Sequence, residues 1–120
     1  MNDNIIKVKS FAIEIRIINL YKFLKENKQE YVLSKQLLRS GTSIGANVRE
    51  GLNAESKKDF IHKLAIAQKE TDETLYWIEL LKETEFIKQT EFNSLSNDLH
   101  EILKIIKSII ITAKNNMTKL

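Results

Sequence analysis

The chain has 120 residues, of which 42% are apolar and 29% charged, with three glycines, no proline and no cysteine. A chain of this length buries one core, so we expect a single domain over residues 1–120. The lack of cysteine excludes disulfides, thiolate zinc sites and cysteine nucleophiles. The first ten residues lack the cationic start and apolar run of a signal peptide, and no apolar run approaches the roughly 18 residues of a membrane span. We therefore expect a cytoplasmic protein with no membrane partner.

The scarcity of turn-forming residues predicts long helices with short connections. Four helices are expected, at about residues 5–26, 31–52, 56–84 and 90–117. Connections this short force successive helices to run antiparallel. The sequence therefore predicts an all-α fold, an up-down-up-down antiparallel four-helix bundle.

The first expected helix is apolar on two faces. Its inner stripe, at helical spacing, consists of Ile6, Ile13, Ile17, Leu20 and Leu24. A second stripe, on nearly the opposite side, consists of Val8, Phe11, Ile15 and Ile18. One helix cannot bury both faces in one small bundle, so the second stripe predicts a contact between subunits.

The second expected helix contains all three glycines. Gly41 and Gly45 lie one turn apart on one flank, and a glycine inside a helix costs about 1 kcal/mol relative to alanine. We therefore expect another helix to approach this flank closely. Gly51 is expected to end the helix in the left-handed conformation. The inward residues of this helix are Leu33, Leu37, Ser40, Ile44 and Val48.

The other flank of the second helix is polar, and it consists of Gln36, Ser43, Asn47 and Glu50. We expect Ser43 and Asn47 to form hydrogen bonds between helices that fix their register, because a buried unpaired amide costs about 1 to 3 kcal/mol. A single sequence leaves open whether this flank is structural or a recognition site.

In the third expected helix, Ser56 and Asp59 form an N-terminal cap and a first-turn acid. The core face consists of Phe60, Leu64, Ala67, Thr71, Leu75, Ile78 and Leu81. A second apolar stripe consists of Ile66, Tyr76, Trp77 and Leu80. We expect this stripe to pack against another subunit, with Glu73 bonding across that contact. Isolated exposed apolar side chains are also common on monomers, and Tyr76 and Trp77 are able to stack on bases.

The fourth expected helix has the most regular 3-4 spacing of apolar residues. This stripe consists of Phe92, Leu95, Leu99, Ile102, Ile106, Ile109 and Ala113.

The formal net charge is only +3, but it is unevenly distributed. Residues 1–69 contain 13 basic and 7 acidic side chains, residues 70–103 contain 2 and 9, and residues 104–120 contain 4 and none. The candidate nucleic-acid-binding residues are Lys35, Arg39, Arg49, Lys57 and Lys58. Multiplied around an oligomer, they would form a basic belt for phosphates. The alternative is a solvated face attracted to the acidic part of the third helix.

The residues of common active sites are missing from the sequence. A di-iron bundle requires two Glu-x-x-His motifs, and neither is present. The only histidines, His62 and His100, lie off the core stripes, and no glycine-rich loop is present to hold phosphates. We therefore expect no catalytic site, no metal and no cofactor, and a protein that is not an enzyme.

The run S-I-G-A-N-V-R-E-G lies at residues 43–51, behind Gln36 and Arg39, and E-T-L-Y-W-I-E-L-L lies at residues 73–81. With Phe60, Leu64 and Ala67, these runs make residues 8–112 resemble the four-helix bundle proteins named for 23S ribosomal RNA intervening sequences. Glu85 departs from the family, because many members carry a glycine there to end the third helix. We therefore expect a different geometry for the third connection.

The resemblance implies a homo-oligomeric ring, typically a pentamer, with no known enzymatic activity. The family is also similar to the accessory protein of diversity-generating retroelements, a basic pentameric barrel that binds nucleic acid and a reverse transcriptase. We therefore expect a non-enzymatic homo-oligomeric adaptor, a pentamer, that presents a basic surface to structured RNA or DNA. A protein partner such as a reverse transcriptase is included in this expectation. The alternative is a protein-only scaffold with no nucleic-acid binding.

Overall fold

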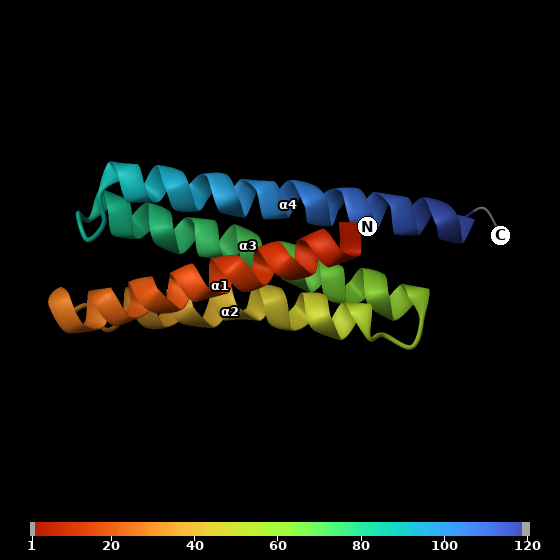
Figure 1. Ribbon diagram of the computed structural model, residues 1–120, viewed down its shortest axis with the longest axis horizontal. Helices are drawn as coiled ribbons and strands as arrows, with labels where there is room; N and C mark the ends of the chain where they lie inside the picture. Colours follow the sequence, from red (N-terminus) through yellow and green to blue (C-terminus); the bar gives the residue numbers. More distant parts are fainter. Residues whose placement is uncertain (1, 119–120) are drawn as a thin grey trace.

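A computed structural model describes residues 2–118. This part of the chain forms four helices, α1 (Asn2–Asn27), α2 (Leu33–Leu52), α3 (Lys57–Glu83) and α4 (Gln89–Thr118). They run back and forth along a rod of 54 × 22 × 19 Å, each antiparallel to the one before (Figure 1). The predicted all-α, up-down-up-down bundle is therefore confirmed, and each helix bound lies within three residues of its predicted position.

The four helices occupy the corners of a square. Each helix contacts its two neighbours, so that α1 lies against α2 and α4, and α3 also lies against α2 and α4. Consequently α1 and α3 occupy opposite corners. The predicted inner stripes form the core, and its largest fully buried side chains include Ile6, Ile13, Ile17, Leu37, Ile44, Leu64, Ile78, Leu95, Leu99 and Ile102.

Gly41 and Gly45 face α1, as their spacing predicted. A Cβ atom at Gly41 would lie 2.6 Å from Cδ1 of the buried Ile17. A Cβ atom at Gly45 would overlap the carboxylate of Glu14. The two glycines therefore allow α1 to approach α2 closely.

The prediction that Gly51 ends α2 in the left-handed conformation is wrong. No glycine in the described residues has a positive φ, and α2 continues to Leu52, with Asn53 as its C-terminal cap. Gly51 is buried, and a Cβ atom there would lie 2.5 Å from Cδ2 of Leu64 on α3. Packing between α2 and α3, and not chain reversal, is the reason that a glycine fits at this position.

Glu30 determines where α2 begins. Its carboxylate accepts backbone N–H hydrogen bonds from Val32, Leu33 and Ser34, at 3.2, 3.0 and 2.7 Å. These are N–H groups that a helix leaves unpaired at its start, and a negative charge is favourable there. Burial of Glu30 acts to raise the pKa of this carboxyl, but the three N–H donors together lower it below its ordinary value.

Ser56 and Glu85 delimit α3. Ser56 is the N-terminal cap, and its hydroxyl accepts the Asp59 N–H at 3.0 Å, as predicted. At the other end Glu85 adopts φ 67°, and the Phe86 N–H donates to the Leu81 carbonyl at 2.9 Å. This is the left-handed termination for which glycine is favoured. Glu85 therefore adopts at this position the backbone conformation that glycine favours.

Candidate assembly and nucleic-acid surfaces

The second apolar stripe of α1 is largely exposed. Val8 is 67% exposed, Phe11 51% and Ile15 47%, and Ile18 is half-buried. Exposed aromatic and β-branched side chains in one row are uncommon on a monomer of this size. The stripe inclines toward α2, because the guanidinium carbon of Arg49 lies 5.4 Å from the centre of the Phe11 ring.

The second stripe of α3 is less exposed. Tyr76 is 52% exposed, whereas Ile66, Trp77 and Leu80 are half-buried, and the rings of Tyr76 and Trp77 pack edge to face at 5.0 Å. Because α1 and α3 lie at opposite corners, the two stripes point to different sides of the bundle.

Glu14 lies beside the α1 stripe, and its carboxylate lies against the backbone of Gly45. Its Oε2 atom accepts the Gly45 N–H at 3.2 Å. Burial raises the pKa of Glu14 to about 7, although the Gly45 hydrogen bond and the nearby charge of Arg49 oppose the rise. The sequence does not single out Glu14, because the alternation of charged and apolar residues along α1 does not show which charge faces a glycine on another helix.

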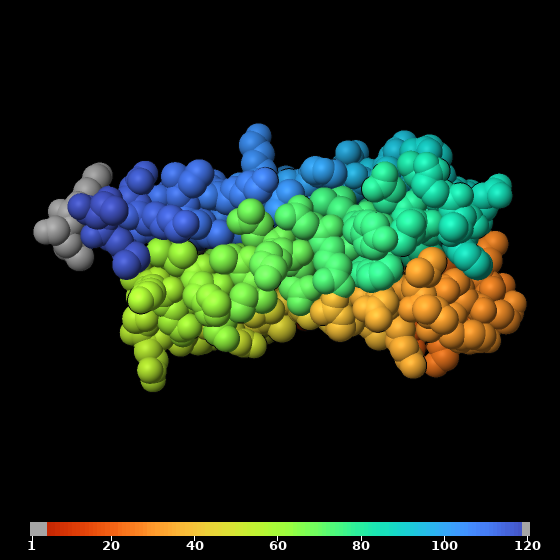
Figure 2. All heavy atoms as spheres, turned by 180° about the vertical axis from the view of Figure 1, so that it is seen from behind, coloured from red at the N-terminus to blue at the C-terminus, as the bar shows by residue number. Residues whose placement is uncertain are grey.

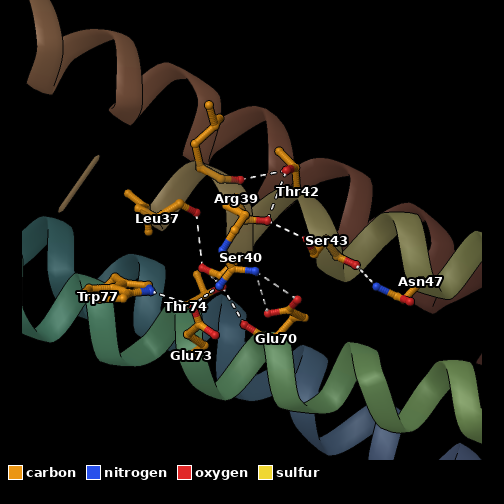
Figure 3. A network of polar contacts seen from close by, with 11 residues as sticks. Leu37, Arg39, Ser40, Thr42, Ser43, Asn47, Glu70, Glu73, Thr74 and Trp77 are labelled. Carbon is orange, nitrogen blue, oxygen red and sulfur yellow. Dashed lines mark hydrogen bonds and ion pairs between the residues drawn. The ribbon is translucent and has the colours of Figure 1, made fainter. Parts of the chain in front are cut away.

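Arg39 is joined to α3 in the network shown in Figure 3. Its guanidinium lies 3.3 Å from the Glu70 carboxylate and also contacts Glu73. Trp77 donates its ring N–H to Glu73 at 3.0 Å, and this hydrogen bond, followed by Arg39, lowers the pKa of Glu73. Glu73 therefore has Arg39 and Trp77 as partners within its own chain, and its expected bond across a subunit contact stays a prediction. The charge of Arg39 is largely satisfied inside the bundle.

A second difference concerns Ser43 and Asn47, which do not form the hydrogen bonds between helices that were expected. The Ser43 hydroxyl donates to the Arg39 carbonyl, and the Asn47 amide donates to the Ser43 carbonyl, both within α2 (Figure 3). Instead, the buried hydroxyls of Ser40 and Thr74 lie 2.9 Å apart and join α2 to α3. The side chains of Ser43 and Asn47 therefore bond to the backbone of their own helix. The hydrogen bond that joins the two helices lies nearer the core, between Ser40 and Thr74.

Further along the polar flank, Glu50 forms an ion pair with Lys63 of α3 at 2.9 Å. This pair also belongs to the contact between α2 and α3.

The predicted basic residues do not form one patch. Lys35 is exposed near the start of α2, whereas Lys57 and Lys58 are exposed at the start of α3, more than about 25 Å of helix away. Arg39 turns toward α3, and Arg49 turns toward Phe11 on α1. Lys35, Lys57 and Lys58 therefore point freely into solvent, at two ends of the bundle.

Within residues 2–118, no group of three or more His, Asp or Glu side chains is arranged to hold a metal ion. In the same residues, no helix has the length and apolar character of a membrane span.

Comparison with known proteins identifies the family. Residues 2–108 match the family described as 23S rRNA-intervening sequence protein. The chain belongs to the 23S rRNA-intervening sequence protein family. A crystal structure from Bacteroides thetaiotaomicron, of a protein with unknown function from the S23 ribosomal protein family, is 55% identical in sequence. The match covers 92% of this chain and 98% of that chain, with a TM-score of 0.91. No curated protein matches the chain.

Proposed function

We propose that this member of the 23S rRNA-intervening sequence protein family is a non-enzymatic, homo-oligomeric adaptor that presents a basic surface to structured RNA or DNA. The observation that carries the proposal is the exposed apolar stripe of Val8, Phe11 and Ile15 on α1. Complete burial of such side chains contributes about 1.5 to 3 kcal/mol each. Because these side chains are 47–67% exposed, burial of the remainder offsets part of the cost of association, which is about 4 to 15 kcal/mol.

The placement of the two stripes supports a ring. The α1 stripe and the α3 stripe lie at opposite corners, an arrangement in which the α1 stripe of one copy can meet the α3 stripe of the next. Head-to-tail contacts of this type close into a ring when the rotation between copies allows it. We propose a pentamer, which is the assembly that the family resemblance implies.

The basic residues support nucleic acid as the partner. Lys35, Lys57 and Lys58 are exposed, and Arg49 is exposed above the Phe11 ring. Lys57 and Lys58 also stand at the start of α3, where the helix dipole favours an anion. Repetition around a ring multiplies these contacts and strengthens binding without any new residue.

A protein-only scaffold is the second candidate, and the Arg39 network favours it. Arg39 forms ion pairs with Glu70 and Glu73, so α2 presents less unpaired positive charge than its sequence indicates. In that case the charges serve assembly and solubility, and the ring binds a protein partner such as a reverse transcriptase.

Retardation of a structured RNA and of duplex DNA distinguishes the two candidates. For the adaptor, binding by the wild-type protein should weaken steeply as salt rises from about 50 to 200 mM. The Lys57→Glu, Lys58→Glu variant should bind nucleic acid more weakly than the wild type. The Arg39→Gln variant should bind as the wild type does, because the Arg39 charge is already paired with α3. Absence of binding to both nucleic acids at the lowest salt would exclude the adaptor and favour the scaffold.

A further inference from the structure

A second basic region lies along the contact between α3 and α4. Residues 102–118 contain three lysines and no acidic side chain, and residues 57–69 contain four lysines and one aspartate. Because α3 and α4 are antiparallel neighbours, the first half of α3 lies beside the second half of α4. Figure 2 shows these two stretches side by side at one end of the molecule, in yellow-green and in blue.

The lysines of α4 form one exposed row. Lys104, Lys107 and Lys114 are exposed and share a helix face with Ile111, since successive members are three or four residues apart. The row extends over about 15 Å of helix. Lys114 and Lys58 of α3 line the same shallow hollow, of about 370 Å³. We call Lys58, Lys104, Lys107 and Lys114 the α4 lysine face.

The lysines of this face form no ion pair with the described residues of the bundle. The ion pairs among the described residues use Lys9, Arg16, Arg39, Lys63 and Lys82, and none of them includes a residue of the α4 lysine face. Lys58 also stands in the first turn of α3, where the helix dipole adds positive potential.

We propose that the α4 lysine face binds the phosphate backbone of nucleic acid, independently of base sequence. This inference rests on the proposed function and identifies the part of the surface that carries it. Exposed lysines are ordinary phosphate contacts, whereas base recognition requires side chains that reach base edges. Interfaces between proteins are instead depleted in lysine and enriched in aromatic residues at their core. The composition of this face therefore fits phosphate better than an acidic protein.

The face is compatible with assembly through α1. The α1 stripe inclines toward α2, where Phe11 lies under Arg49, and the α4 lysine face inclines toward α3, where Lys114 lies near Lys58. The two surfaces are therefore on different sides of the bundle. The α3 stripe also inclines toward α2, since Trp77 bonds to Glu73, which contacts Arg39 of α2. A ring in which the α1 stripe meets the α3 stripe therefore leaves the lysines of α4 exposed, and an oligomer repeats the face once in each subunit.

The test compares two triple variants that each remove three positive charges. One is Lys104→Gln, Lys107→Gln, Lys114→Gln. The matched control is Lys22→Gln, Lys25→Gln, Lys28→Gln, at exposed positions in the last turns of α1 and directly after it, at the other end of the bundle. Affinity for an RNA hairpin and for duplex DNA is measured by fluorescence anisotropy from about 50 to 200 mM salt. Light scattering and thermal unfolding establish that both variants keep the wild-type mass and fold.

We expect the α4 variant to bind both nucleic acids at least about tenfold more weakly. The slope of log affinity against log salt should fall by about one for each lysine removed per subunit. The control should retain the wild-type slope. If the wild type binds and the α4 variant binds equally well, or if both variants lose the same affinity, the inference is wrong and the proposed function stands. If the wild type binds neither nucleic acid, the proposed function itself fails.

Discussion

The carboxylate of Glu14 occupies the space that a side chain at position 45 would need, and it accepts the Gly45 N–H at 3.2 Å. At Gly41, one turn earlier, the same space is filled by the buried Ile17. Both glycines therefore allow α1 to approach α2 closely, but each lies against a different side chain of α1. One neighbour is a polar group at the end of a flexible side chain, and the other is a rigid part of the core.

This difference predicts unequal effects of an alanine substitution at the two positions. Gly41→Ala should lower the free energy of unfolding by about 1 to 3 kcal/mol, because Ile17 has no free space into which to move. Gly45→Ala should be close to neutral, because displacing the end of Glu14 is compensated by the higher helix propensity of alanine, about 1 kcal/mol. Urea unfolding of both variants measures the difference. Equal losses at the two positions would show that α1 does not distinguish them.

The raised pKa of Glu14 predicts that its contribution to the stability of the folded protein falls as pH rises. Its folded pKa, about 7, lies above the ordinary value of 4.5, so the folded state holds the proton more tightly than the unfolded state. Its contribution to stability is therefore present below pH 4.5 and is lost as pH rises through about 7. Glu14→Gln should raise the melting temperature at pH 8 and leave it nearly unchanged at pH 4. A larger gain at pH 4 than at pH 8 would contradict the burial of this carboxyl.

For Glu30 we expect the opposite dependence, a contribution to stability that is lost as pH falls. Its folded pKa lies below 4.5, so its contribution is present above pH 4.5 and is lost as pH falls through the folded pKa. At pH 7, Glu30→Gln should lower the free energy of unfolding by about 1 to 3 kcal/mol, because charge-assisted bonds to three N–H groups at the start of α2 are weakened. The deficit should shrink as pH falls below 4.5. Glu26→Gln, at an exposed site nearby, is the control and should change stability by less than about 0.5 kcal/mol.

Glu85 offers a stabilising substitution. With φ 67° it holds a conformation that glycine adopts without strain, so Glu85→Gly should raise the free energy of unfolding by about 0.5 to 1 kcal/mol. Glu83→Gly, two residues earlier and still inside α3, should lower it by about 1 kcal/mol. Thermal unfolding of the pair checks both signs. A loss of stability in both variants would show that α3 does not end in a left-handed residue.

Sequence reasoning succeeded where the cause is local. The 3-4 spacing of apolar residues locates each helix and its buried face, because one side of a helix repeats with that period. The Ser56 cap of α3 was also predictable, since a side chain and an N–H three residues later belong to one short segment. The family likewise followed from short runs on two helices and is confirmed over residues 2–108.

The errors concern contacts between helices. The position of Gly51 in the sequence does not show that Leu64 of α3 lies against it. The position of Arg39 likewise does not show that Glu70 and Glu73 of α3 lie within reach of its guanidinium. Glu30 was missed for a different reason, because it lies two residues before the N-terminal cap and bends forward to reach the helix. Periodicity gives the direction of a side chain from its own helix, but not what the neighbouring helix places opposite it.

Assembly through α1 is the central claim, and the molar mass in solution tests it most directly. Multi-angle light scattering at micromolar concentration should give a multiple of the 14.0 kDa chain mass, close to five copies. Ile15→Asp, which adds a charge to the exposed stripe without changing the core, should lower that mass and leave the helical content intact. Exposed Lys22→Asp on the same helix is the control and should keep the wild-type mass. A wild-type protein that stays at 14.0 kDa would contradict the account.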